Sequence, residues 1–274
     1  MITLDIRLIV VDVDGTIAGV SNEVNEPVIR AIEAVQAKGI PVAIATGRMY
    51  RSACRFHRAI NSSLPLIAYN GAWIQEPDSG KIHRHIPIAE EFAVDLLDYL
   101  EQPEWRAELS INFYVDDTLY VRELNVETEI YRQRSGITPV AIGDLRTLAP
   151  RGTTKILAMG EDPTIIERLW MDLQLRYREG GLYFTQSTKT FFEVTHRDAT
   201  KGSATKFLAE EFLGLNAGNV LAIGDNFNDV TMLTYAGFGV AMGDAPPEVK
   251  EIADWVAPSV EADGVAAVLE RFVL

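Results

Sequence analysis

The sequence predicts an α/β fold, a doubly wound and mostly parallel sheet that is interrupted by a separate α+β segment. Two observations predict it. Near both ends of the chain, short apolar runs alternate with amphipathic stretches, which is the rhythm of a parallel sheet covered by helices on both faces. In the middle of the chain, apolar runs separated by turn residues indicate hairpins instead.

The first predicted strand is Leu8–Val11, an apolar and mostly β-branched run that indicates burial on both faces. A helix is expected next, with Asn25 as its N-cap residue. The apolar runs Val42–Ala45 and Leu66–Tyr69 predict two more strands, with a helix over residues 49–60 between them. Strand, helix and strand in this order form a βαβ crossover, which we expect to be right-handed.

The character of the chain changes after Asn70. Hairpins are predicted over residues 72–86 and 110–122, because turn residues separate two apolar runs in each. The other expected elements of this segment are helices over 87–101, 126–134 and 163–177, and strands over 154–159, 182–185 and 191–194. Hairpins mixed with helices predict an α+β layer with an antiparallel sheet.

The βα rhythm returns after Thr200, with a strand at Val220–Ile223 and a helix at Val230–Tyr235. The simplest account is one Rossmann-like core made from both ends of the chain, residues 1–81 and 196–274. Residues 82–195 are then an inserted α+β cap domain.

The composition narrows the classes of partner. The formal net charge of -14 argues against binding to nucleic acid or to an anionic membrane surface. It leaves room for a small phosphorylated substrate, because a metal ion and a few local cations offset the field. No stretch approaches the roughly 18 apolar residues of a membrane span, and Asp5 and Arg7 interrupt any apolar signal segment. The single cysteine, Cys54, fits a reducing compartment, so we expect a cytoplasmic protein.

Two carboxylates follow the first predicted strand. Side chains alternate along a strand, so Asp12 and Asp14 begin on the same side. Two such acids can hold a hard cation such as Mg²⁺. One of them can also attack phosphorus while the other moves protons. Taken alone, the pattern also fits a turn capped by an Asp side chain.

The other predicted core strands also end in polar residues. These are Thr46-Gly47-Arg48, Asn70-Gly71 and the run Gly224–Asp229, while Lys201-Gly202 opens the helix before the last of these strands. Ligands bind at the carboxyl ends of strands in an open parallel sheet. If the strands are parallel, all these groups collect at one edge, which favours a phosphate and metal site over a simple turn.

Seven motifs then carry a family resemblance: Asp12–Thr16, Ala45–Arg48, Asn70–Ala72, Lys201-Gly202, Gly224–Asp229, Val240–Gly243 and Asp263–Ala266. On these motifs the chain resembles the haloacid dehalogenase (HAD) superfamily of phosphatases. More narrowly it is similar to the Cof-type branch, which carries a large inserted α/β cap. Their order and spacing agree from end to end, so the resemblance covers nearly the whole chain.

The resemblance implies a role for each acid. Asp12 is the expected nucleophile that forms an aspartyl-phosphate. Asp14 is the expected general acid/base, which protonates the leaving alcohol and then activates water. Asp12, Asp225 and the backbone carbonyl of Asp14 are the expected ligands of Mg²⁺. Asn228 and Asp229 are expected beside this set, where they also cap the turn that orients Asp225.

Other matched positions are expected to handle the phosphate. Thr46 offers a hydroxyl and Gly47 a backbone N–H, and Lys201 supplies a positive charge that also offsets Asp12. Arg48 and Asn70 are possible contacts of the phosphate or of the substrate just beyond it.

The function expected from these residues is a Mg²⁺-dependent phosphatase that hydrolyses a small phosphorylated metabolite. Candidate substrates are a sugar phosphate, a phosphoglycolate-like acid, or a nucleotide or cofactor phosphate. One alternative is a phosphomutase or phosphotransferase that uses the same aspartyl-phosphate. Another is a non-catalytic phosphoacceptor or ligand-binding regulator, against which Asp14 argues, because a pure acceptor needs no acid/base two residues further on.

Overall fold

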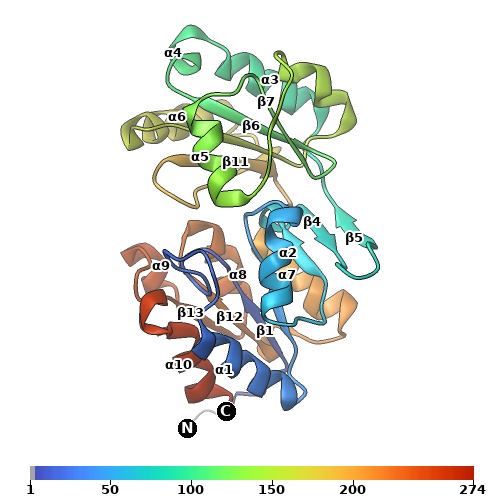
Figure 1. Ribbon diagram of the computed structural model, residues 1–274, viewed down its shortest axis with the longest axis vertical. Helices are drawn as coiled ribbons and strands as arrows, with labels where there is room; N and C mark the ends of the chain where they lie inside the picture. The colour runs from blue at the N-terminus through green and yellow to red at the C-terminus, as the bar shows by residue number, and fades with distance from the viewer. Residues whose placement is uncertain (1–3) are drawn as a thin grey trace. The chain divides into compact units, whose positions relative to one another are not determined.

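The computed structural model describes residues 4–274, which divide into two compact units (Figure 1). The first unit combines the chain up to Arg84 with Thr200–Leu274, and the second is His85–Ala199. The chain therefore passes between the units twice, at residues 84–85 and at residues 199–200. Each unit has a hydrophobic core of its own.

The first unit is built on a parallel sheet in the strand order β14-β13-β12-β1-β2. Its central strand, β1 (Leu8–Val11), pairs with β12 (Val220–Gly224) on one side and with β2 (Val42–Ile44) on the other. The outer strands are β13 (Phe238–Ala241) and β14 (Trp255–Val256). This arrangement confirms the predicted doubly wound core, in which both ends of the chain contribute strands.

Helices cover both faces of this sheet (Figure 1). Ile9 and Val11 point to a core shared with α1 (Glu26–Ala37), α2 (Tyr50–Ala59) and α10 (Gly264–Phe272). Leu8 and Val10 point to the opposite core, with α7 (Lys201–Lys206), α8 (Val230–Tyr235) and α9 (Pro247–Glu251). Because successive side chains of β1 alternate, this one fully buried strand joins both layers.

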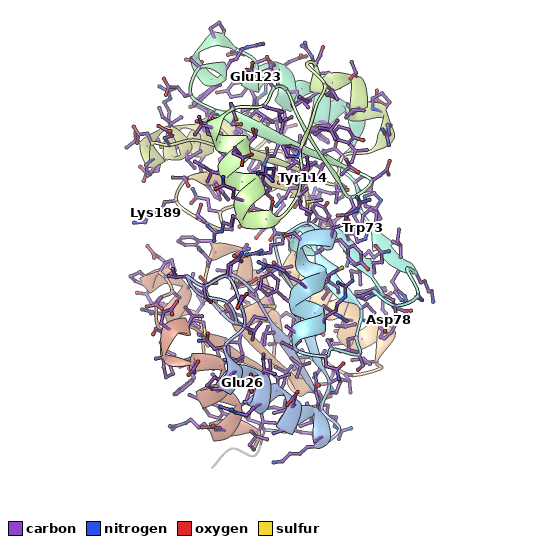
Figure 2. The ribbon with its side chains drawn as sticks, in the orientation of Figure 1. Glu26, Trp73, Asp78, Tyr114, Glu123 and Lys189 are labelled. Atoms are coloured by element: carbon purple, nitrogen blue, oxygen red, sulfur yellow. The ribbon has the colours of Figure 1, made fainter. Side chains whose placement is uncertain are left out.

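The third predicted strand is shorter than expected and turns away from the parallel sheet. β3 (Leu66–Ala68) touches the end of β2 through one parallel bridge, Ala45 to Ile67, and then pairs antiparallel with β4 (Trp73–Gln75). Tyr69 and Asn70 take left-handed backbone angles, with φ of 52° and 56°, which ends the strand. β5 (Ile82–His85) completes this small sheet, and Asp78 lies in the exposed turn before it (Figure 2).

Asn25 precedes α1 at the N-cap position, but its side chain does not form the expected cap. Its Nδ2 donates instead to Asp263 Oδ1, 2.9 Å away, at the start of α10. Beyond the other end of α1, Lys38 Nζ donates to the carbonyl oxygens of Val273 and Leu274, at 3.1 and 2.8 Å. The two helices are thus tied together at both ends.

The second unit is built on a sheet in the order β10-β11-β9-β6-β7-β8, antiparallel except for β7 with β8. Its strands are β6 (Ser110–Val115), β7 (Thr118–Val121), β8 (Val140–Ala141), β9 (Lys155–Met159), β10 (Leu182–Thr185) and β11 (Phe191–His196). Its helices are α3 (Glu90–Leu100), α4 (Pro103–Arg106), α5 (Val126–Ser135) and α6 (Pro163–Arg176). The mixture of hairpins and helices agrees with the α+β layer expected for this segment.

The two faces of this sheet differ in character. Phe113, Ile156 and Phe192 lie on the face that packs with α3 and α6. The opposite face carries a buried ion pair, in which Lys155 Nζ donates to Glu193 Oε2 at 3.0 Å. On the same face the hydroxyl of Tyr114, labelled in Figure 2, donates to the hydroxyl of Tyr131 on α5 at 2.8 Å.

Short 3₁₀ segments connect several elements. They are Tyr69–Gly71, Leu145–Arg151, Ala217–Asn219, Phe227–Asp229 and Val260–Ala262, and a π-helical turn, Phe207–Phe212, continues α7. Among residues 4–274, no helix is both long enough and apolar enough to cross a membrane.

Candidate active site

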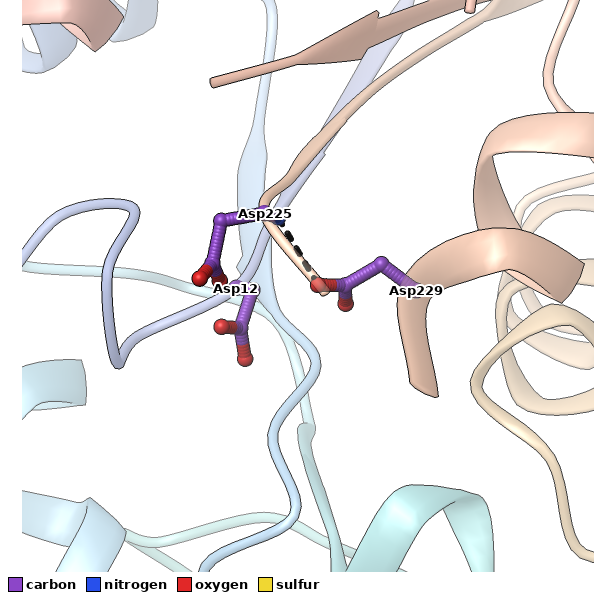
Figure 3. A group of neighbouring side chains, drawn as sticks. All are labelled: Asp12, Asp225 and Asp229. Atoms are coloured by element: carbon purple, nitrogen blue, oxygen red, sulfur yellow. Dashed lines mark hydrogen bonds between the residues drawn. The ribbon is translucent and has the colours of Figure 1, made fainter. Parts of the chain in front are cut away.

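Three aspartates meet where the central strands of the first unit end. Asp12 follows β1, Asp225 follows the adjacent parallel strand β12, and Asp229 ends the 3₁₀ segment after it. One carboxylate oxygen from each lies within 4.8 Å of the others (Figure 3). Asp12 and Asp229 are buried and Asp225 is half-buried. The parallel pairing of β1 with β12 is what brings these residues together across most of the chain.

Asp229 fixes the loop that carries Asp225. Its Oδ2 accepts hydrogen bonds from the backbone N–H groups of Asp225 and Asn226, at 2.9 and 3.0 Å (Figure 3). Its Oδ1 accepts from Lys201 Nζ at 2.6 Å. A Cβ atom at Gly224 would lie only 2.5 Å from the Cβ of Asp229, so this approach requires glycine. Both oxygens of Asp229 are therefore engaged in shaping the loop behind Asp225.

Lys201 lies between the nucleophile candidate and the loop acid. It is the first residue of α7, whose N-terminus is held by a capping box between Thr200 and Ser203. Its side chain is fully buried, and Nζ donates to Asp12 Oδ1 as well as to Asp229, both at 2.6 Å. A buried ammonium with two carboxylate partners is fixed in place, so Lys201 holds the orientation of Asp12.

The electrostatics of the group are dominated by crowded acids. Burial raises the pKa of Asp12 to about 7, with Asp229 and Asp14 adding to the rise and Lys201 opposing it. Burial, with the charges of Asp12 and Asp229, also raises the pKa of Asp225 well above its usual range. Burial alone would lower the pKa of Lys201, but the two carboxylates outweigh it and raise that pKa. One ammonium does not balance these carboxylates, so a further cation is favoured here.

The turn after Asp14 rests against Asp225. Gly15 has a φ of +80°, and a Cβ atom there would lie 2.3 Å from Asp225 Oδ2. Thr16 Oγ1 donates to Asp225 Oδ1 at 3.3 Å. The glycine is required both by its backbone angle and by the lack of space, and the threonine holds the turn.

The side chain of Asp14 lies apart from the three clustered acids and pairs with Arg48. Arg48 donates from Nε to Asp14 Oδ2 at 2.7 Å and from Nη2 to Oδ1 at 2.6 Å. The same Nη2 donates to Asn22 Oδ1 at 2.6 Å. Sequence reasoning missed this network, because residues 14, 22 and 48 belong to three separate segments with no spacing signal between them.

The other residues expected to handle phosphate form a connected group at the same strand ends. Thr46 is buried, its hydroxyl oxygen accepts from the backbone N–H of Arg48 at 3.1 Å, and its carbonyl accepts from Asn70 N–H at 2.9 Å. Asn228 Nδ2 donates to Asn70 Oδ1 at 3.1 Å. Gly47 lies between Thr46 and Arg48, in the bend that leads to the start of α2 at Tyr50.

The acids fit a hard divalent cation. The donors available are carboxylate oxygens of Asp12 and Asp225. The family resemblance adds the backbone carbonyl of Asp14, two residues after Asp12. Mg²⁺ prefers such oxygen donors, whereas zinc sites are usually built with Cys or His. The carboxylates of Asp12, Asp225 and Asp229 carry more negative charge than Lys201 neutralises, which also favours a bound cation.

Comparison with known proteins places the chain among enzymes. A sequence profile of haloacid dehalogenase-like hydrolases matches residues 9–269. A "Putative phosphatase" from Haemophilus influenzae is 30% identical over 263 residues, which cover 95% of each chain. A Bacillus subtilis protein named 5-amino-6-(5-phospho-D-ribitylamino)uracil phosphatase is 27% identical, with 97% of each chain covered.

A solved structure from B. subtilis, described as a haloacid dehalogenase-like hydrolase, superimposes with a TM-score of 0.86. It is 26% identical, and the match covers 98% of this chain and 100% of that one. The profile and these relatives match nearly the whole length of the chain and share its fold. The class they indicate is the one that the strand-end motifs predict. The chain therefore belongs to the haloacid dehalogenase-like hydrolases, and it is a phosphatase.

Proposed function

We propose that the protein is a Mg²⁺-dependent phosphatase that hydrolyses a small phosphorylated metabolite through an aspartyl-phosphate on Asp12. The observation that supports this most is the setting of Asp12. Its carboxylate is held by the buried Lys201, lies in one acidic group with Asp225, and is followed two residues later by a second acid, Asp14.

In the first step, an oxygen of Asp12 attacks phosphorus while the bond from phosphorus to the leaving alcohol breaks. The carboxyl proton of Asp14 passes to the departing oxygen. In the second step, the Asp14 carboxylate takes a proton from water, and the water oxygen attacks phosphorus while the bond between phosphorus and the Asp12 oxygen breaks. Inorganic phosphate leaves, and Asp12 and Asp14 return to their starting forms.

The remaining residues would serve these steps by binding and orientation. Asp12, Asp225 and the Asp14 carbonyl would hold Mg²⁺, which when bound supplies charge stabilisation for the phosphoryl oxygens. Thr46 and the N–H of Gly47 would bind phosphate oxygens, together with Lys201. Asn70 and Asn228, which are hydrogen-bonded to each other, would support this pocket.

For the substrate, we propose a sugar phosphate or another small polar phosphate ester. One relative is named for a phosphate on a ribityl side chain, and the net charge of -14 disfavours a polyanionic partner. We also propose that residues 82–195, the inserted cap, enclose the reaction, because a phosphorylated enzyme benefits from a lid that excludes stray water. Side chains of such a cap would then select among substrates.

The test is a panel of sugar phosphates, phosphoglycolate and nucleotide monophosphates, assayed for released phosphate with Mg²⁺ and after EDTA treatment. We expect turnover with Mg²⁺ only. In Asp12→Asn the amide has nearly the same shape but is a poor nucleophile, so hydrolysis should disappear while circular dichroism stays unchanged. Near-normal turnover by that variant would contradict the proposal. A product phosphorylated on an added sugar, in place of free phosphate, would identify a phosphotransferase.

A further inference from the structure

The environment of Asp14 supports an inference that rests on the proposed function. We infer that Arg48 is a positioning residue that orients the carboxyl group of Asp14 for proton transfer to the leaving alcohol, and that it is not a phosphate ligand. The geometry behind this is the two-pronged contact of the Arg48 guanidinium with both oxygens of Asp14, at 2.6 and 2.7 Å.

Two parallel N–H···O hydrogen bonds fix the plane of a carboxyl group as well as its location. One hydrogen bond, or a point charge such as an ammonium, leaves the carboxyl group free to rotate. A carboxyl oxygen has more than one lone-pair direction, so a carboxyl group can carry and deliver a proton while two N–H donors hold it. Proton transfer needs this alignment, because small displacements of a reacting group are costly in rate.

Arg48 is itself held from several sides. Its side chain is 10% exposed, and its guanidinium carbon lies 4.6 Å from the ring centre of the buried Phe56. Its backbone N–H donates to the Thr46 hydroxyl, and its carbonyl accepts from Tyr69 N–H at 2.9 Å. A residue restrained in this way presents a fixed surface to Asp14.

Asn22 adds a brace to Arg48. Its Oδ1 accepts from Arg48 Nη2 at 2.6 Å, the same nitrogen that donates to Asp14. Asn22 has a φ of 59°, a conformation that asparagine tolerates better than most residues. The loop between Asp14 and the start of α1 thus folds back to support the arginine that holds Asp14.

A positioning role and a phosphate-binding role predict different dependence on the leaving group. Dinitrophenyl phosphate releases a stable phenolate that needs no proton, whereas an alkyl phosphate releases an alcohol that does. The constant kcat/KM reports only the steps up to phosphoryl transfer to Asp12 when that transfer is irreversible. Comparing kcat/KM for the two esters, with Mg²⁺ present, therefore isolates proton delivery.

The experiment uses dinitrophenyl phosphate and the alkyl phosphate that the panel shows to be turned over best. In Arg48→Met, we expect kcat/KM for the alkyl ester to fall by about 10²-fold or more, within the usual range for general acid catalysis. For dinitrophenyl phosphate we expect a change of less than about tenfold, since no proton is needed there. Arg48→Lys should not restore the alkyl reaction, because a lysine cannot form the paired contact.

Two further variants sharpen the result. Asn22→Gly removes the brace without backbone strain. We expect a smaller loss of kcat/KM than in Arg48→Met, and again a larger loss for the alkyl ester than for dinitrophenyl phosphate. The double variant Asp14→Asn/Arg48→Met should be no slower on the alkyl ester than Asp14→Asn alone, because both changes remove one function.

The matched control is Arg58→Met. Arg58 lies on the same helix as Phe56 but is exposed, so we expect an unchanged ratio between the two esters. Thermal unfolding of every variant separates folding from chemistry, and Arg48→Lys carries the test if Arg48→Met does not fold.

Equal losses of Arg48→Met on both esters, or a rise in KM with kcat retained, would show that Arg48 binds phosphate and would overturn the inference. If Asp14→Asn itself loses both esters equally, the acid/base role in the proposed function is wrong. If Asp14→Asn shows the leaving-group effect and Arg48→Met does not, only the inference fails.

Discussion

At the scale of single residues, Lys201 is a tightly held charge. It is fully buried and contacts Asp12 and Asp229 at equal distances of 2.6 Å. The sequence predicts that this lysine binds phosphate and offsets the charge of Asp12, but it does not predict the second contact, with Asp229. Removing one member of a buried ionic group leaves the others without compensation, which is more costly than losing an exposed pair.

Lys201→Met should therefore reduce both stability and activity. We expect a loss of about 3–5 kcal/mol in the free energy of unfolding, typical of a broken buried ion pair, measured by urea denaturation. Lys206→Met is the matched control, because Lys206 lies on the same helix, is exposed and is 3.9 Å from Glu210. A Lys201→Met protein as stable as the control would show that the buried contacts do not stabilise the fold.

At the scale of elements, the buried pair of Lys155 on β9 and Glu193 on β11 crosses two neighbouring strands of the second unit. Each side chain is 3% exposed, and Ser187 also donates to Glu193. Lys155→Met should destabilise the protein by about 3–5 kcal/mol, because it leaves the buried Glu193 carboxylate without its cation. The double variant Lys155→Met/Glu193→Leu should regain most of that loss. Denaturant titrations of the wild type and the two variants provide the comparison, and a double variant no more stable than the single one would contradict this account.

The helix α2 contributes a pH dependence through His57. Burial lowers the pKa of His57, although the contact of its Nε2 with the Leu64 carbonyl at 2.8 Å opposes the shift. The unfolded chain then binds more protons than the folded chain below about pH 6.5, so stability falls as pH drops through that region. Thermal unfolding of His57→Asn between pH 5 and 8 should show a shallower fall than the wild type. Parallel curves would mean that other groups account for the acid sensitivity.

The predictions from sequence succeeded where a local pattern dictates the element. The apolar runs of β1, β2 and β12 are so strongly patterned that their place in a parallel core follows directly. The side-chain partner of Asn25 did not follow, since it depends on Asp263 at the far end of the chain. The pairing of Asp14 with Arg48 was missed for the same reason. Tertiary contacts between distant polar side chains leave no periodic signal, whereas strands and helices do.

At the scale of the whole molecule, the second unit is one continuous segment, His85–Ala199, with a separate core. We expect that replacing it with a Gly/Ser linker leaves the sheet and acidic site of the first unit intact. If residues in the insertion choose the substrate, such a protein should cleave dinitrophenyl phosphate slowly and lose its preference among larger esters. Circular dichroism checks folding, and the phosphate panel measures preference. An unchanged order of preference would place substrate choice in the first unit.

The division of the chain also sets an order of events during synthesis. The central strand β1 is made well before its partner β12 and the counter-ion of Asp12, since Asp12 and Lys201 are 189 positions apart. The second unit is contiguous, so it can fold while residues 200–274 are still being made. Until then, the apolar strand and its unpaired acid have no stable place. The early part of this chain is therefore the part that nascent-chain chaperones have most reason to bind.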